Sequence, residues 1–255
     1  MKLLHLADLT TDEIAAIVAK PPCAVLLPVG SVEPHGPHLP LGTDSLLSEE
    51  SSRRAARALR AQGVSAFLAP SVPYGVTEFA AGFAGAIGVA AEVLTPFLAA
   101  ITARFVADGW SHVCLVNNHL EPAHDAAVRA AIAGLAPGRA SVACPLTKRW
   151  GRTLSDEFKR GNCHAGRYET SLVLAAGGQA SSERARLPSL DVSLSDGIRA
   201  GKVTFRAMGM DRAYTGAPAD ATPEEGELLY ARLAEMIVTE VLESLALSSP
   251  PPRTS

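Results

Sequence analysis

Short apolar runs alternate with longer amphipathic segments along this chain, and the alternation predicts an α/β fold. The apolar runs end in Gly, Pro, Ser or Asn, as buried parallel strands commonly do. The amphipathic segments between them are long enough to cross from one parallel strand to the next. The predicted strands cover residues 23–31, 65–75, 112–118 and 140–146, and the predicted crossover helices cover residues 46–62, 89–108 and 122–135.

Helices are also predicted near both ends of the chain. Thr10 and Glu13 have the spacing of a capping box, which predicts the start of a helix that runs through Val18. After residue 146 the hydrophobic periodicity weakens, and polar residues, glycines and prolines become frequent. We predict loops over 147–165 and 178–222, and helices over 168–176 and 223–245.

Nothing in the sequence marks a boundary between two domains. The chain has 255 residues, within the range of one α/β domain, and it contains no internal repeat and no long linker. We therefore expect a single domain over residues 1–247, built as a three-layer α/β/α sandwich with a mostly parallel central sheet. Residues 248–255, which include three prolines, are expected to form a disordered tail.

Composition and charge exclude several classes of function. A hydrophobic content of 47% excludes a disordered protein, and 23 basic against 26 acidic residues leave no basic surface for nucleic acid or an anionic membrane. No apolar run is long enough to span a bilayer, and the N-terminus lacks a signal-peptide core. We expect a cytoplasmic protein that acts on a small molecule.

The four cysteines indicate core packing rather than metal or disulfide chemistry. They are far apart and form no C-x-x-C pair, which argues against a zinc finger and a disulfide framework. Cys23, Cys114 and Cys144 lie in apolar runs, so we expect them in the core. Cys163 lies beside His164 and could line a pocket.

The histidines are distributed in a way that composition alone does not show. Five of the seven fall in three short segments associated with predicted strand ends, where the loops of a parallel sheet converge on ligands. Glu33 and His35 follow the first strand, and their i, i+2 spacing directs both side chains to one side of an extended chain. The Gly- and Pro-rich residues after them could turn Asp44 back toward that point. His119 and Glu121 repeat the spacing after a second strand.

These five residues predict a catalytic metal centre. If Asp44 bridged two ions, each ion would receive three protein ligands and keep open positions for water. Imidazole and carboxylate ligands without thiolate suit Zn²⁺ or Mn²⁺, with Fe²⁺ possible. In a third segment, His164 could act as a general acid, and Glu169 could orient a ligand or the attacking water.

The remaining histidines and one tryptophan carry weaker expectations. His5 and His112 precede apolar runs without an acidic neighbour, so we expect structural roles for both. His38 could line the pocket or bond the backbone of a turn. His124 is expected to be exposed or to lie behind the ligands. Trp150 could line the pocket.

At these motifs the sequence resembles the creatininase (creatinine amidohydrolase) family. Residues 28–44 resemble the family signature P-V-G-S-x-E-x-H-G-x-H-L-P-L-x-T-D, and residues 164–171 resemble its H-A-G-x-x-E-T-S segment. The NNHLEP run at 117–122 and the late Gly/Pro segment at 214–222 also match. The resemblance extends over roughly residues 23–230.

The resemblance implies a fold, an oligomer and an activity. The implied fold is an α/β/α sandwich, and the implied assembly is a homohexamer. By matching position, one ion would be held by Glu33, Asp44 and His119, and the other by His35, Asp44 and Glu121. The implied reaction is hydrolysis of a C–N bond in a cyclic or linear amide.

The same resemblance assigns catalytic roles and leaves the substrate open. His164 corresponds to the catalytic histidine, and Glu121 and Glu169 are further catalytic candidates. Residues 159–163 contain no aromatic side chain where creatininase proper has a tryptophan. We therefore predict a metal-dependent hydrolase that cleaves an amide or lactam of a small polar substrate. The alternatives are a deformylase or a cyclic-ketone C–C hydrolase with the same centre, or a non-catalytic metal-binding member.

Overall fold

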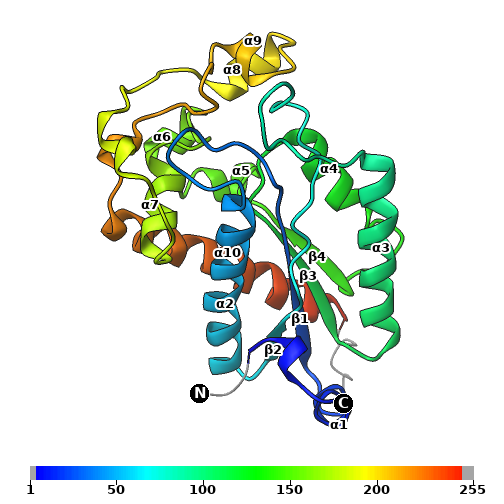
Figure 1. Cartoon of the computed structure of the whole chain (residues 1–255). Coiled ribbons are helices and arrows are strands. Elements are labelled where there is room, and N and C mark those ends of the chain that lie inside the picture. Colours follow the sequence, from blue (N-terminus) through cyan, green and yellow to red (C-terminus); the bar gives the residue numbers. More distant parts are fainter. Residues whose placement is uncertain (1–3, 249–255) are drawn as a thin grey trace.

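A central sheet of four parallel strands organises the molecule. The computed structural model describes residues 4–248, and its strands lie in the order β2-β1-β3-β4 (Figure 1). Nearly every strand residue is buried, as expected for a parallel sheet covered on both faces. The predicted strands are confirmed, with the bounds β1 Cys23–Val29, β2 Ser65–Leu68, β3 His112–Asn117 and β4 Ala140–Ala143.

Strand β2 is shorter than the predicted 65–75. Pro70 and Pro73 lack the N–H that a sheet ladder needs, so regular pairing ends at Leu68. Beyond it, one isolated bridge between Val29 and Val72 keeps the chain beside β1. The residues that follow are therefore free to form a loop over the carboxyl end of the sheet.

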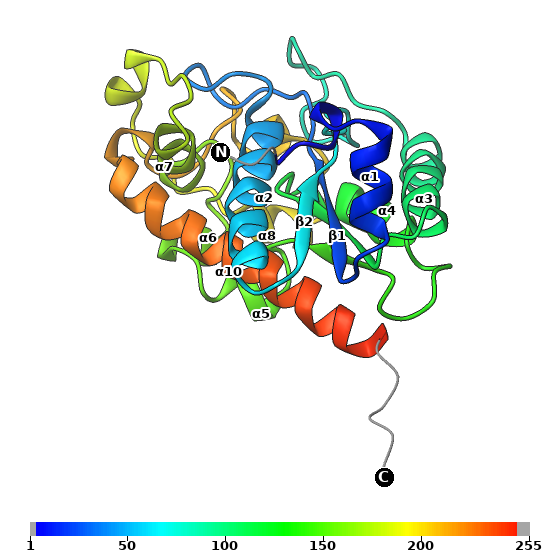
Figure 2. The same ribbon diagram turned by 90° about the horizontal axis from the view of Figure 1, so that it is seen from below.

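Helices cover both faces of the sheet and confirm the three-layer architecture (Figures 1 and 2). Alternate residues of β1 point to opposite faces: Leu26 belongs to the core on one side, and Val25 to the core on the other. The first side is packed by α2 Thr43–Ala61, α7 Arg167–Ala175 and α10 Pro223–Ser248, and the second by α1 Thr11–Val18, α3 Ala91–Ala107 and α4 Pro122–Ala130.

Some helix bounds differ from the predicted ones. The capping box at Thr10 and Glu13 is present. Helix α2 begins before residue 46 and places Asp44 in its first turn, whereas α4 ends at Ala130 rather than 135. The predicted loops contain short helices, α5 Lys148–Gly151, α6 Asp156–Lys159, α8 Leu194–Arg199 and α9 Phe205–Met208, and the 3-10 turns η2 Ser182–Arg186 and η3 Pro218–Asp220. A further 3-10 turn, η1 Leu6–Asp8, precedes α1.

The C-terminal helix runs slightly further than predicted. Helix α10 continues to Ser248, and the rest of the tail predicted over 248–255 lies outside the described residues. Between residues 4 and 248, no helix combines the length and the hydrophobicity needed to cross a membrane.

The region around α8 and α9 forms a cap over the carboxyl end of the sheet (Figure 1). Phe205 and Met208 of α9 pack with Ala80 in a small hydrophobic cluster separate from the two main cores. The Phe205 N–H also donates to the Phe79 carbonyl oxygen at 2.7 Å. This packing and this hydrogen bond therefore attach the cap to the loop after β2.

Candidate metal centre

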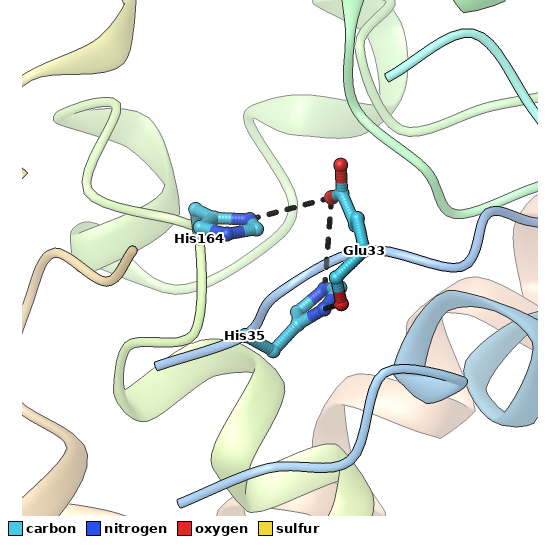
Figure 3. A group of neighbouring side chains, drawn as sticks. All are labelled: Glu33, His35 and His164. Carbon is cyan, nitrogen blue, oxygen red and sulfur yellow. Dashed lines mark hydrogen bonds and ion pairs between the residues drawn. The ribbon is translucent and has the colours of Figure 1, made fainter. Parts of the chain in front are cut away.

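The residues predicted to carry the chemistry meet at the carboxyl end of the sheet. Glu33 and His35 follow β1, Asp44 lies in the first turn of α2, and His119 and Glu121 follow β3. His164 and Glu169 come from the segment before α7 and from its first turn. All seven side chains are buried. Figure 3 shows the Glu33 carboxylate paired with the imidazoles of both His35 and His164.

One group of candidate ligands surrounds His119. Its Nδ1 lies 3.3 Å from Oε1 of Glu33 and 3.1 Å from Oδ2 of Asp44. Glu121 joins this group, because ligand atoms of Glu33, His119 and Glu121 all lie within 4.8 Å of one another. These residues could hold one ion.

A second group surrounds His35. Its Nε2 lies 3.1 Å from Oδ1 of Asp44 and 3.6 Å from Oε2 of Glu169. Asp44 thus directs one oxygen to each group, as a bridging carboxylate would. Glu169 lies among the possible ligands here, whereas the sequence resemblance places Glu121 beside His35 and Asp44. Which of the two glutamates completes the second site stays a prediction.

The hydrogen bonds of the three histidines fit a centre that holds cations. Each ring donates one N–H to a main-chain carbonyl, which fixes the tautomer and directs the other nitrogen's lone pair toward carboxylates. Lone pairs aimed at anionic oxygens repel them unless a cation lies between. The three bonds are His35 Nδ1 to Glu33 at 3.0 Å, His119 Nε2 to Val76 at 2.6 Å and His164 Nε2 to Pro34 at 2.9 Å.

The electrostatics of these side chains lead to the same conclusion. Burial lowers the pKa of His35, but the carboxylates of Asp44, Glu169 and Glu33 outweigh it and raise that pKa to about 10. Burial raises the pKa of Glu169 to about 8. Oδ2 of Asp44 has no hydrogen-bond partner among the described residues. The cluster carries excess negative charge, which protons or metal ions must balance.

The pKa values of Glu121 and His164 shift in opposite directions. Burial raises the pKa of Glu121 to about 7, although two main-chain N–H groups and His119 oppose it. Burial, with a smaller contribution from His35, lowers the pKa of His164 to about 4. His164 is therefore a neutral imidazole whose Nδ1 can accept a proton.

A cavity of about 170 Å³ opens onto this cluster. The acids and histidines form its floor, and its walls are mostly apolar. Phe205 of the cap stacks on the His164 ring, with ring centroids 4.3 Å apart. Lys159 is the one cationic side chain that lines the cavity within residues 4–248. The apolar wall residues are Phe79, Leu120, Leu146, Phe158, Leu194, Ile198 and Phe205.

Some other expectations about single residues are settled by these contacts. Cys163 lines the cavity, whereas the Trp150 indole donates to Glu240 and lies elsewhere. His38 bonds to the Thr170 hydroxyl. His112 is structural, as predicted, because its ring nitrogens bond to the Gly138 carbonyl and the Ser141 hydroxyl.

Sequence reasoning missed the loop over residues 75–79. The Thr77 hydroxyl donates to the Glu33 carboxylate, and the N–H groups of Glu78 and Phe79 donate to Glu121 at 3.0 and 3.1 Å. Two of these contacts use main-chain atoms, which no residue type signals. His124 is fully buried beside His119, so of the two places expected for it, exposed or behind the ligands, the structure shows the second. Its spacing with Ala127 and Val128, on one helix face, would have indicated burial.

Comparisons with known proteins agree with this geometry. The creatininase family model, described as creatinine amidohydrolase, matches residues 7–241. A mycofactocin precursor peptide peptidase from Mycobacterium tuberculosis (strain CDC 1551 / Oshkosh) is 30% identical over 228 residues, which cover 86% of this chain and 84% of the relative.

Solved structures show the same fold at lower sequence identity. One described as "Creatininase Mn" has a TM-score of 0.74 at 22% identity and covers 98% of this chain and 100% of that one. A mutant creatininase of "Zn-Zn type" has a TM-score of 0.73 at 21% identity and covers 99% and 100%. Because the family model matches nearly the whole described chain, this protein belongs to the creatininase family of hydrolases.

Proposed function

We propose that the protein hydrolyses a C–N amide bond at a centre that holds two divalent metal ions. The observation that carries the proposal is the set of three anchored imidazoles whose free nitrogens face buried carboxylates around Asp44. The name of one relative, a peptide peptidase, and the description of the family model, creatinine amidohydrolase, support an amide as the bond attacked. Manganese and zinc forms of the structural neighbours support Zn²⁺ or Mn²⁺, and Fe²⁺ also fits the ligand set.

In this proposal, Glu33, Asp44 and His119 hold one ion, and His35 and Asp44 hold the other together with Glu121 or Glu169. Bound ions would supply Lewis acidity toward the amide carbonyl and would activate water for attack. The protein's own contribution is to fix the ligands in a buried, pre-formed arrangement.

Proton transfer falls to residues of the cavity floor. The amide C–N bond breaks, the water oxygen joins the carbonyl carbon, and a water proton must reach the leaving nitrogen. Glu121 and His164 both line the cavity, and we propose that they take up that proton and deliver it. Oε2 of Glu169 accepts the Ala165 N–H at 2.6 Å, which holds the turn that presents His164.

An assay of the metal-loaded protein tests this function. A panel of linear amides, lactams including creatinine, formamides and cyclic ketones distinguishes C–N hydrolysis from deformylation and C–C cleavage. We expect metal-dependent hydrolysis of amides, with about two ions bound per chain. Stable metal binding without turnover of any panel member would instead favour a non-catalytic role.

The cavity walls modify the expected substrate. A small polar substrate would leave Phe158, Phe205 and their neighbours without a partner, so we propose an amide attached to an apolar group. Lys159 would pair with an acidic substituent of that amide. Lys159→Met is expected to raise KM for an acidic apolar amide by roughly tenfold, the effect of about 1.4 kcal/mol, with KM for its uncharged analogue unchanged.

Steady-state kinetics on the two matched substrates check this prediction. Lys202→Met, which removes an exposed lysine outside the cavity, is the control. Equal changes in KM for the charged and the uncharged substrate would show that Lys159 does not bind the acidic group.

We further propose a homo-oligomer, for which the sequence resemblance implies a hexamer. Tyr74, Val93 and Phe97 are 47%, 61% and 53% exposed and line one apolar groove between the loop after β2 and α3. Monomers rarely leave such large apolar side chains together in water. Phe97→Asp is expected to dissociate the assembly in light scattering, whereas Leu228→Asp on α10 leaves it intact. An unchanged mass for Phe97→Asp would remove this groove as the interface.

A cytoplasmic location is part of the same proposal. Cys23, Cys114, Cys144 and Cys163 are all buried and unpaired. Free thiols of this kind suit a reducing compartment, where disulfides do not persist.

A further inference from the structure

His124 lies directly behind the candidate ligand His119. It belongs to α4, its side chain is fully buried, and the two rings meet edge to face with centroids 4.7 Å apart. Its Nδ1 accepts a hydrogen bond from the Val76 N–H at 3.2 Å. Because an N–H can only donate, Nδ1 carries the lone pair and the His124 proton is on Nε2.

Val76 connects this histidine to the metal centre. The Val76 carbonyl accepts the Nε2 proton of His119 at 2.6 Å, so one residue bonds to both histidines. The next residues continue the contact: Thr77 bonds to Glu33, and Glu78 and Phe79 donate to Glu121. Three candidate ligands are therefore held by one stretch of chain, residues 76–79.

The packing at Gly75 shows how closely His124 supports that stretch. A Cβ at position 75 would lie 2.7 Å from both Cε1 and Nδ1 of His124 and 2.8 Å from the Gly30 carbonyl oxygen. There is no room for a side chain between the imidazole and the main chain. The ring thus acts as a direct support for the loop.

His124 would be an unfavourable residue for folding stability if its only role were to fill space. Its Nε2 has no hydrogen-bond partner among the described residues. A buried donor without a partner destabilises a fold, whereas an apolar side chain at this position would carry no such penalty. The Nδ1 acceptor is the feature that an apolar residue would lack.

We propose that His124 is a positioning residue for the metal centre. Through the Val76 main chain, it fixes the tautomer and orientation of His119 and keeps residues 76–79 against Glu33 and Glu121. This inference rests on the proposed function only in taking His119, Glu33 and Glu121 as ligands.

Two substitutions in the full chain test the role of the acceptor. His124→Leu removes it, whereas His124→Asn keeps an oxygen near the position of Nδ1. Zinc affinity is measured by competition with a chromogenic chelator, beside kcat and KM for the best amide of the panel. We expect His124→Leu to lose roughly 10- to 100-fold in zinc affinity, the usual effect of removing a group that orients a ligand. His124→Asn should stay within a few-fold of the unmodified chain, and kcat should fall more than KM changes.

A structural role alone would give a different pattern. His112→Leu is the matched control, because it removes another buried histidine that bonds away from the centre, and it should lower Tm without changing zinc affinity. Unchanged zinc affinity in His124→Leu, or equal losses in His124→Leu and His124→Asn, would overturn the positioning role. Zinc binding without amide hydrolysis by the unmodified chain would contradict the proposed function alone, and no zinc binding would contradict both.

Discussion

Asp44→Ala is expected to lower kcat by about a thousandfold and to remove metal from both halves of the centre. Asp44 is the carboxylate that lies 3.1 Å from both His35 Nε2 and His119 Nδ1, through different oxygens. Loss of a bridging ligand therefore affects two ions at once, and metal ions contribute several kcal/mol to transition-state stabilisation. A loss of about 4 kcal/mol corresponds to that factor of about a thousand.

Elemental analysis of the purified variant, together with its rate, checks this expectation. Asp44→Asn keeps the shape and one oxygen, so it should retain more metal than Asp44→Ala while losing most activity. Asp125→Ala is the control, because it removes a carboxylate that pairs with Arg129 outside the centre. Normal metal content in Asp44→Ala would show that Asp44 is not a shared ligand.

Removing the metal is expected to produce the largest change in stability. An ion present at 1,000 times its Kd stabilises the folded state by about 4 kcal/mol. For a chain of this size each kcal/mol shifts Tm by about 2–4 °C, so each ion should contribute about 8–16 °C. Thermal unfolding before and after treatment with a chelator measures the shift, and readdition of Zn²⁺ or Mn²⁺ should restore Tm. A Tm that does not respond to the chelator would contradict a metal centre at these residues.

The metal-free protein should also become less stable as pH rises. His35 has a raised pKa, about 10, so the folded state holds its proton more tightly than the unfolded state does. The resulting stabilisation is complete below the unfolded pKa of about 6.5 and is lost as pH approaches 10. The pKa of Glu169 is also raised, to about 8, so the folded state holds this proton more tightly as well, and the stabilisation it gives is likewise lost as pH rises to about 8.

Thermal unfolding between pH 7 and pH 9.5 tests the sign of this effect. We expect Tm of the chelator-treated protein to fall across this range. The metal-loaded protein should change less, because ions take the place of the protons at His35 and its neighbours. A rising Tm in the chelator-treated protein would mean that other groups dominate the charge balance.

Hydrophobic patterning and turn residues predicted the architecture because both act locally. The buried runs at β1 and β3 end in residues that stop strands, so their ends, and the side chains that follow them, could be located. Strand β2 was overestimated because apolar residues continue past Pro70, where pairing does not. The sheet order β2-β1-β3-β4 depends on packing between distant segments and has no local signal.

The candidate site was predictable to the extent that it uses side chains. Spacing indicated Glu33, His35, Asp44 and His119 as neighbours, and the structure brings them together. Which glutamate lies beside His35 could not be read from spacing, because it depends on how α7 packs against α2. The contributions of Val76, Glu78 and Phe79 were invisible because they are made by peptide groups.

Because main-chain atoms of residues 76–79 hold the candidate ligands, ligand support and the shape of the cavity do not depend on the same side chains. Carbonyl and N–H groups at 76, 78 and 79 hold the candidate ligands whatever side chains those positions carry. The Phe79 side chain instead contributes to the cavity wall and packs edge to face on Phe205 of the cap, with ring centroids 6.1 Å apart. Directed evolution of substrate range could therefore vary position 79 among side chains that keep this packing and retain catalytic competence, whereas proline at 78 or 79 would remove a required donor.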